Sequence, residues 1–287
     1  MSPTLVRHQL PHSGSIRCDD PPVPDRSRRT RDWAEIQERM LIPLYEAAYD
    51  RLGIGPGTRL LGLGCGSGLA LLLATARGAQ VSGVDADESR LELARERLTP
   101  EGGPEHTRLV SGGLDAAAPG DAAFNVVTAF HPVGCVSTVE GLTASLTAAA
   151  GLAERGSAVV LGGWGPVERC ATAGVLGVAQ RLADPRGDCA VGSAGAWPSG
   201  RDDLEELADR AGLRPDGSGR VACPFGYADP ASAVRGLLST GLFDAALETT
   251  EERQVEKELA EALHPYQRAD GTVWMPNVFR YLIARTR

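Results

Sequence analysis

The sequence has almost no lysine. Lys257 is the single lysine among 29 lysine and arginine residues, so arginine carries nearly all of the positive charge. Acidic residues outnumber basic ones, the formal net charge is -8, and the arginines form no basic stripe. Proteins whose main partner is nucleic acid usually carry such a stripe. We therefore expect no nucleic-acid partner, and no phosphate-binding loop of the kind that needs a lysine.

The sequence also lacks closely spaced cysteines and long apolar runs. Six cysteines are scattered without a CxxC pair, which fits neither a disulfide framework nor a zinc site. We expect reduced thiols, no metal and a cytoplasmic location. No segment has the long uncharged apolar run of a membrane span, and residues 1–28 have no apolar signal-peptide core, so no membrane partner is expected.

The length and composition are typical of one α/β domain with an elaboration. The chain has 287 residues, of which 43% are hydrophobic, and this is enough to bury a full core. Residues 1–28 are rich in proline, serine, arginine and aspartate and are predicted to be a disordered tail. The domain is expected to occupy residues 29–287.

The most informative stretch runs from Thr58 to Asp85. A short apolar run is followed by a glycine-rich turn, a helical pattern (69–76), a second apolar run (81–84) and then an acid. This order predicts a nucleotide-binding βαβ unit. The turn contains Gly64, Gly66 and Gly68, which let the backbone approach a ligand closely, and N–H groups at the helix start favour a ligand carboxylate. Asp85 is then placed to accept hydrogen bonds from a ribose.

The remaining elements alternate between helix and strand as far as Gly165. Beyond that residue the alternation loosens, and segments 165–200 and 225–270 are expected to cap the substrate side. Segment 33–52 has helical spacing, with a break expected at Pro43, and residues 29–55 are expected to form lid helices. The predicted helices are 88–98, 141–153, 167–182, 202–211, 230–247 and 251–264, and the predicted strands are 107–110, 123–130, 157–162, 214–224 and 277–284.

The glycine spacing G-x-G-x-G, followed by an acid after the next strand, resembles motif I of the class I S-adenosylmethionine (SAM) dependent methyltransferases. Residues 30–287 resemble the small-molecule branch of the ubiquinone/menaquinone-biosynthesis type, in strings such as DWAEIQE, GLALLLA, LELARERL, NVVTAF and NVFRY. The resemblance implies a Rossmann-like α/β fold, with a seven-stranded, mostly parallel sheet, an antiparallel last strand and a helical cap. It implies SAM as cofactor, held by Gly64, Cys65, Gly66, Gly68, Asp85, Ala86, Leu114 and Phe130.

Three positions depart from the family pattern. Gly62 stands where the family has an acid before the turn, Gly113 where it has the aspartate that meets the adenine, and Asn125 where it has F-D-V-V. Two of these lost carboxylates are expected to face the cofactor. Losing two charge-assisted hydrogen bonds of roughly 1.5 to 3 kcal/mol each weakens binding by about a hundredfold to several thousandfold. Asp115 or the Leu114 N–H offers compensation, so we expect SAM to bind weakly or in a changed pose.

His131 is the candidate catalytic residue. It follows the fourth predicted strand, at the sheet edge where open α/β folds bind ligands, and its ordinary pKa suits a general base. Packing at the strand end is the alternative. Candidate substrate contacts are Tyr45 and Tyr49 on the lid, Trp164 after the fifth strand and His264 on the cap, with ordinary packing again the alternative.

The sequence therefore predicts a SAM-dependent methyltransferase that modifies a small-molecule, secondary-metabolite acceptor. Two alternatives remain open. One is an enzyme of the same fold that transfers no methyl group, such as a cyclase or another acid/base catalyst that uses His131. The other is a non-catalytic protein that holds a partner subunit. Homodimer formation is also left open.

Overall fold

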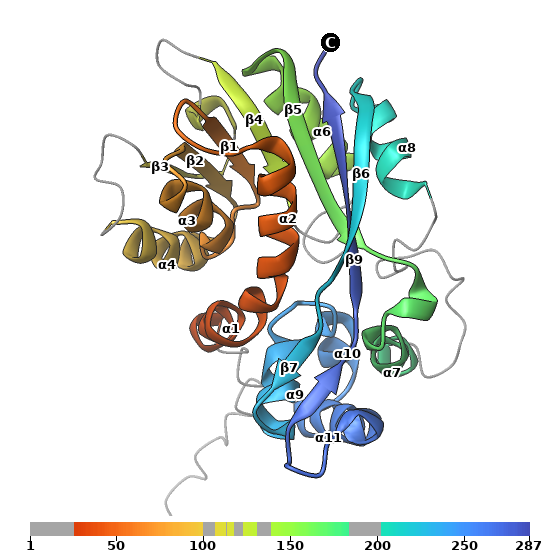
Figure 1. Ribbon diagram of the computed structural model, residues 1–287. Helices are drawn as coiled ribbons and strands as arrows, with labels where there is room; N and C mark the ends of the chain where they lie inside the picture. Colours follow the sequence, from red (N-terminus) through yellow and green to blue (C-terminus); the bar gives the residue numbers. More distant parts are fainter. Residues whose placement is uncertain (1–25, 100–106, 113, 118–122, 131–138, 184–201) are drawn as a thin grey trace, which may run out of the picture.

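A seven-stranded sheet forms the centre of the protein. The computed structural model describes residues 26–99, 107–112, 114–117, 123–130, 139–183 and 202–287 (Figure 1). The strand order is β3-β2-β1-β4-β5-β9-β6, and β9 pairs antiparallel with both β5 and β6. This confirms the predicted fold class, including the antiparallel last strand. The strands are β1 (Arg59–Leu63), β2 (Gln80–Asp85), β3 (Thr107–Ser111), β4 (Phe124–Ala129), β5 (Ala153–Trp164), β6 (Arg214–Ala222) and β9 (Val278–Arg285).

Helices cover both faces of this sheet. One face is covered by α2 (Ile42–Leu52), α3 (Leu69–Ala76) and α4 (Glu88–Leu98), and the other by α6 (Val139–Gly151) and α8 (Asp203–Arg210) (Figure 1). Two hydrophobic clusters follow from this arrangement, one containing Leu44 and Leu71 and the other Leu146 and Leu207. The central strands are apolar on both faces, because both faces are buried.

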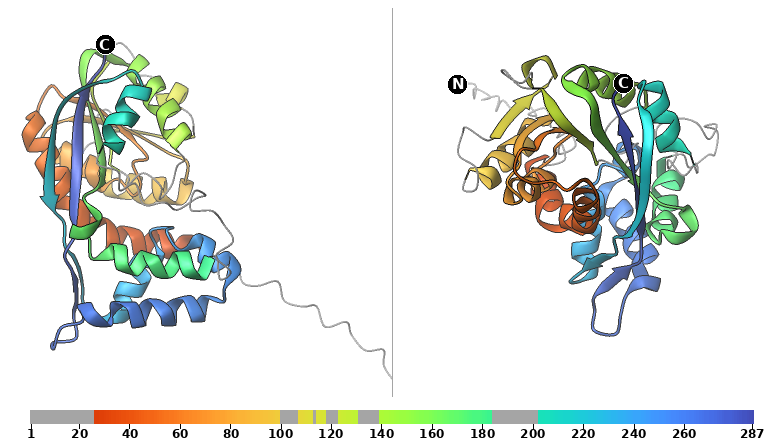
Figure 2. Two further views of the ribbon diagram at one scale, coloured as in Figure 1. Left: turned by 90° about the vertical axis from the view of Figure 1, so that its right-hand side faces the viewer. Right: turned by 45° about the horizontal axis from the view of Figure 1, so that its top comes forward.

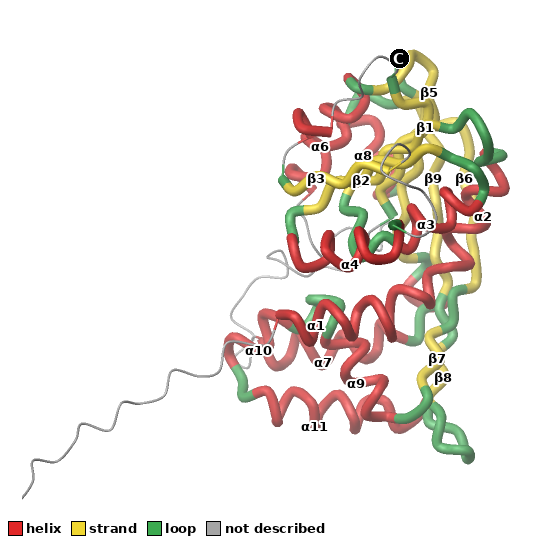
Figure 3. The backbone as a smooth tube through the Cα atoms, turned by 90° about the vertical axis from the view of Figure 1, so that its left-hand side faces the viewer, coloured by secondary structure: helices red, strands yellow, loops and turns green. Residues whose placement is uncertain are grey.

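A group of helices lies beyond the carboxyl ends of the parallel strands and forms the cap (Figures 2 and 3). Next to the helices, β7 (Phe225–Tyr227) and β8 (Val273–Met275) pair as a small antiparallel ribbon. No helix in the described part of the chain is long and apolar enough to cross a membrane. The cap helices are α1 (Arg26–Asp32), α7 (Thr172–Ala183), α9 (Pro230–Leu238), α10 (Asp244–Thr249) and α11 (Glu252–Leu263).

The cap contains most of the differences from the predicted elements. The predicted helix 230–247 is wrong because it is divided into α9 and α10. The Ser239 and Thr240 hydroxyls donate to the carbonyls of Gly236 and Leu237, both at 2.6 Å, and Gly241 follows with a φ of 81°. Such side-chain bonds and a left-handed residue both compete with helix continuation.

Several element boundaries also differ from prediction. The predicted helix from residue 167 has only a 3-10 turn at Val167–Arg169 before α7 begins at Thr172. The predicted strand 214–224 ends at Ala222, and β8 was not predicted. The predicted tail 1–28 is wrong in its last residues, because α1 begins at Arg26.

The lid helices are less regular than predicted. Between α1 and α2 the chain forms a π-helical turn (Trp33–Gln37) and then a 3-10 turn (Glu38–Leu41). The predicted break lies just before Pro43, which occupies the first turn of α2. A proline is tolerated there because the first N–H groups of a helix have no intrahelical partner.

Candidate cofactor and acceptor site

The glycine turn joins β1 to α3 in a shape that requires glycine. Gly64, Gly66 and Gly68 have φ values of 58°, 56° and 80°. A Cβ at Gly68 would lie 2.8 Å from the Cβ of Ala94 on α4, so a side chain there has no room. The turn therefore has three positions without a side chain at the start of α3, as the spacing predicted.

Asp85 closes onto this turn from the end of β2. Its Oδ2 accepts a hydrogen bond from the Gly66 N–H at 2.8 Å, and its Oδ1 accepts one from the Asp87 N–H at 2.9 Å. The side chain is buried, with 5% of the residue exposed. A carboxylate offers about four lone-pair sites, so acceptor capacity for ribose hydroxyls remains.

A second carboxylate, Glu38, reaches the turn from the lid. Glu38 is buried, accepts a hydrogen bond from the Ser67 hydroxyl, and pairs with Arg97 of α4 at 2.7 Å. Arg97 also donates to the Ser67 carbonyl at 3.0 Å and to the Ala34 carbonyl at 2.7 Å. The Arg97 guanidinium thus joins the lid segment, residues 33–41, to the glycine turn.

Burial dominates the electrostatics of Glu38. Desolvation raises the pKa of this carboxyl above its ordinary value, while the Ser67 hydroxyl, Arg97 and the Leu69 N–H act in the opposite direction. The N–H groups at the helix start were predicted to favour a ligand carboxylate, but two N–H groups in this region are already occupied. The Gly66 and Leu69 N–H groups already serve the protein's own carboxylates, Asp85 and Glu38.

The departure at Gly62 has a steric explanation. A Cβ at this position would lie 2.9 Å from Leu71 Cδ2, so the space of the family's acid is filled by Leu71. A Cβ at Gly83 on the neighbouring strand would likewise lie 2.7 Å from Leu71 Cδ1. Helix α3 therefore lies close to the sheet, and a carboxylate at residue 62 would require the Leu71 side chain to move.

The departure at Asn125 concerns a different end of the sheet. Its Oδ1 accepts a hydrogen bond from the Arg59 N–H at 2.8 Å, and its Nδ2 donates to the Gly57 carbonyl at 3.0 Å. These bonds join the beginnings of β4 and β1, opposite to the glycine turn. Gly113 lies outside the described residues, as does the side chain of Asp115.

Phe130, at the end of β4, packs against both predicted lid tyrosines. Its ring centroid lies 4.9 Å from Tyr45 and 5.7 Å from Tyr49. Tyr49 is fully buried, and its hydroxyl donates to the Ala70 carbonyl at 2.9 Å. This packing gives no support to the substrate role predicted for Tyr49.

Cys65 is buried in the turn. Burial, Asp85 and Glu38 all raise the pKa of its thiol well above the ordinary value. The thiol therefore stays protonated at neutral pH and is suited to packing, not to nucleophilic attack.

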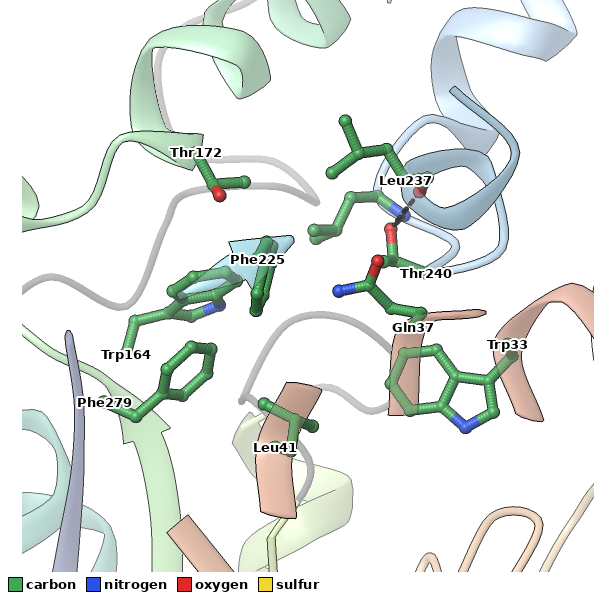
Figure 4. Close-up of a pocket in the computed structure, with 10 residues that line it drawn as sticks. Trp33, Gln37, Leu41, Trp164, Thr172, Phe225, Leu237, Thr240 and Phe279 are labelled. Atoms are coloured by element: carbon green, nitrogen blue, oxygen red, sulfur yellow. Dashed lines mark hydrogen bonds between the residues drawn. The ribbon is translucent and has the colours of Figure 1, made fainter. Parts of the chain in front are cut away.

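An apolar cavity lies between the lid, the cap and the end of β5 (Figure 4). It is small, with a volume of about 20 Å³, which is little more than one water molecule needs. Trp164 lines it, and Gln37 lines it from the residue next to Glu38. The substrate contact predicted for Trp164 stays a prediction. The lid segment thus touches the glycine turn and the cavity with adjacent side chains. The lining residues are Trp33, Gln37, Leu41, Trp164, Thr172, Phe225, Leu237, Thr240, Leu242 and Phe279.

The other predicted residues do not line this cavity. His264 is exposed at the end of α11, Ala86 is exposed after Asp85, and Leu114 packs against the second hydrophobic cluster. His131 lies outside the described residues, and its catalytic role stays a prediction. The roles predicted for Ala86, Leu114 and His264 likewise stay predictions.

Sequence reasoning missed Glu38, Arg97 and most of the cavity wall. The available signal was the pair Gln37-Glu38, two polar residues within a segment of apolar helical spacing. Phe225, Phe279 and Thr172 gave no signal, because the fold joins segments far apart in the sequence.

Residues 60–156 match the model of a family described as a methyltransferase domain. The methyltransferase GfsG from Streptomyces halstedii is 43% identical over 70 residues, which is 24% of this chain and 24% of that protein. The chain thus matches about a quarter of the length of this curated relative.

Solved structures share the fold over most of the chain. A SAM-dependent methyltransferase from Thiobacillus denitrificans, in complex with S-adenosyl-L-homocysteine, has a TM-score of 0.52 and 19% identity, covering 92% of this chain and 99% of that one. The [4+2]-cyclase SpnF has a TM-score of 0.50 and 14% identity, covering 85% of this chain and 80% of that one. At these identities the likeness establishes the Rossmann-like methyltransferase fold.

Proposed function

We propose that this protein is a SAM-dependent methyltransferase that acts on a small-molecule acceptor. The observation that carries the proposal is the bare glycine turn closed by Asp85, within the segment that matches the methyltransferase domain. Gly64, Gly66 and Gly68 leave room for a ligand beside the backbone, and Asp85 has acceptor sites left for the ribose.

The charges around the turn fit this cofactor. Asp85 and Glu38 are acidic, and Arg97 is the cation paired with Glu38, so the three groups together carry one net negative charge when ionised. SAM supplies an activated methyl group on a positively charged sulfonium. A site with net negative charge favours such a ligand over an anion.

The protein's own part in the reaction is mainly alignment. Methyl transfer is a direct displacement, so the donor and the acceptor have to be held in line and water excluded. The lid segment 33–41 contacts the turn through Glu38 and the cavity through Trp33, Gln37 and Leu41. His131 is proposed as the residue that takes the proton of the acceptor.

Mass spectrometry of the purified protein tests this proposal. We expect co-purifying SAM or S-adenosyl-L-homocysteine and, with an acceptor supplied, a product one methyl group heavier. Absence of both cofactor forms, together with no SAM binding at millimolar concentration, would contradict it.

A second candidate is an acid/base catalyst of the same fold that transfers no methyl group. Two features favour it: Leu71 fills the space of the family's acid at Gly62, and the protein's own carboxylates take turn N–H groups. Since a [4+2]-cyclase shares the fold, the fold alone does not decide between methyl transfer and this second function. A product of unchanged mass would identify this second function.

A further inference from the structure

The lid segment, residues 33–41, lies between two parts of the protein. Figure 3 shows α1, which leads into the segment, between α4 on one side and the cap helix α9 on the other. The segment itself is a π-helical turn followed by a 3-10 turn. A short stretch of this kind between helices often marks a hinge. The position of the segment therefore depends strongly on the side chains that hold it from either side.

On the side of the glycine turn, the lid segment is held by Arg97. This side chain donates to the Ala34 carbonyl at 2.7 Å and pairs with Glu38 at 2.7 Å. The Glu38 carboxylate in turn accepts hydrogen bonds from the Ser67 hydroxyl and the Leu69 N–H, and Ser67 is fully buried. A ligand can bond to either of these donors only after Glu38 has moved away. Access to this part of the turn thus depends on the lid.

On the side of the cap, the lid segment is held by Arg235 of α9 and Tyr227 of β7. Arg235 donates through Nε to Asp32 Oδ2 at 3.2 Å and pairs through Nη2 with the other carboxylate oxygen. Asp32 is buried and directly precedes the lid segment. The Tyr227 hydroxyl donates to Gln37 Oε1 at 2.9 Å. Because Gln37 is next to Glu38, the cap is bonded to the neighbour of the residue that closes the turn.

We propose that the lid segment is a latch through which the cap controls access to the cofactor turn. Arg235 and Tyr227 hold the lid where Glu38 covers Ser67, and loss of their bonds opens the turn, although both side chains lie on the cap. The coupling is reciprocal, because a ligand that binds the opened turn weakens the cap bonds by the same factor. The identification of this ligand as SAM rests on the proposed function, whereas the latch itself does not.

Hydrogen–deuterium exchange, followed by mass spectrometry of the full chain without ligand, tests the latch. Arg235→Met removes a charge-assisted bond and should raise the exchange rates in peptides covering residues 33–41 and 64–72 by about tenfold or more. Tyr227→Phe removes a single hydroxyl and leaves the ring in place. It should raise the exchange rates in the same two peptides by a smaller factor, about fivefold.

Arg285→Met is the matched control for Arg235→Met. The Arg285 side chain is 36% exposed, against 45% for Arg235, and it pairs with Asp216 of β6, outside the lid. We expect unchanged exchange in both peptides. Faster exchange that stays within α9 in Arg235→Met, or an equal rise in the turn peptide in Tyr227→Phe and in the control, would overturn the proposal.

Stopped-flow measurement of SAM binding to the same proteins separates the latch from the proposed function. In Arg235→Met the association and dissociation rate constants should both rise, by about threefold or more, because the turn is open for a larger fraction of the time. Unchanged rate constants would remove the control of the cofactor by the cap and leave the proposed function intact. No SAM binding to any of the proteins, with the expected exchange, would remove the cofactor and leave the latch.

Discussion

Asp85 and Glu38 bring two carboxylates to the glycine turn, residues 64–68. Asp85 comes from the end of β2 and Glu38 from the lid, and each binds a donor on the turn or at the start of α3. Arg97 balances one of the two charges. The remaining negative charge is what makes a positively charged cofactor preferable at this site.

Arg97→Met tests the link between Arg97 and Glu38. The variant leaves a buried carboxylate without its cation and removes the bonds to Ser67 and Ala34, so we expect a loss of about 3 kcal/mol in the free energy of unfolding. Urea denaturation measures it. In the double variant with Glu38→Gln, part of this loss should be recovered. Strictly additive costs would show that the two side chains act independently.

Glu38 also predicts a pH dependence of stability. Its pKa is raised in the folded protein above the ordinary value of 4.5, so the folded state binds this proton more tightly than the unfolded chain. As pH falls from about 7.5 through the folded pKa, the natural protein should gain stability relative to Glu38→Gln, with no further gain below the ordinary value. Urea denaturation of both proteins at several pH values checks this. A constant or shrinking difference would contradict the assignment.

Asn125→Asp tests which lost acids matter to the cofactor. Restoring the family's residue here should leave SAM affinity unchanged, because Asn125 binds Arg59 and Gly57 at the other end of the strands. The aspartate cannot donate to the Gly57 carbonyl, so stability should fall by about 1 kcal/mol. Calorimetry and thermal unfolding measure the two effects. A clear gain in SAM affinity would place residue 125 in the cofactor site.

At the scale of elements, the site depends on how closely α3 approaches the sheet and α4. Gly62 and Gly83 allow Leu71 to fill the space between α3 and the strands, and Gly68 allows contact with Ala94. Each contact holds the glycine turn in place. The position of the turn therefore depends on how α3 packs as well as on the backbone conformation of the turn.

Gly68→Ala measures this packing. The substitution combines strain at a φ of 80° with a Cβ contact of 2.8 Å to Ala94. Gly57→Ala is the control, because Gly57 has a φ of 86° but nothing within 4 Å of the added Cβ. We expect about 1 kcal/mol of destabilisation in the control and roughly 2 to 4 kcal/mol in Gly68→Ala. Similar melting temperatures for the two variants would contradict the packing argument.

The predictable elements were those in which local pattern and tertiary packing agree. The strand, turn and helix around Gly64–Gly68 follow from short-range signals, and β9 follows from the family resemblance. The lid was harder to predict. Its π-helical turn at Trp33–Gln37 and 3-10 turn at Glu38–Leu41 depend on contacts with Arg97 and Ser67, which are distant in sequence. Helical spacing carries no information about such contacts.

At the scale of the whole molecule, the glycine turn and the cavity both contact the lid segment, residues 33–41. The glycine turn belongs to the sheet, whereas the cavity is assembled from the lid, β5, α7, β7, α9 and β9 (Figures 1 and 4). Of the cavity residues, Trp164 alone was predicted from sequence, because it directly follows a recognisable strand. The others come from cap elements whose packing no local pattern specifies.

Calorimetric titration with SAM, of the natural protein and of Asp85→Asn, tests the central claim most directly. The account predicts a dissociation constant in the micromolar range, about 1 to 100 μM. Loss of one charge-assisted hydrogen bond should weaken binding in Asp85→Asn by about tenfold to a hundredfold. No binding at millimolar SAM, or equal affinity in the two proteins, would contradict it.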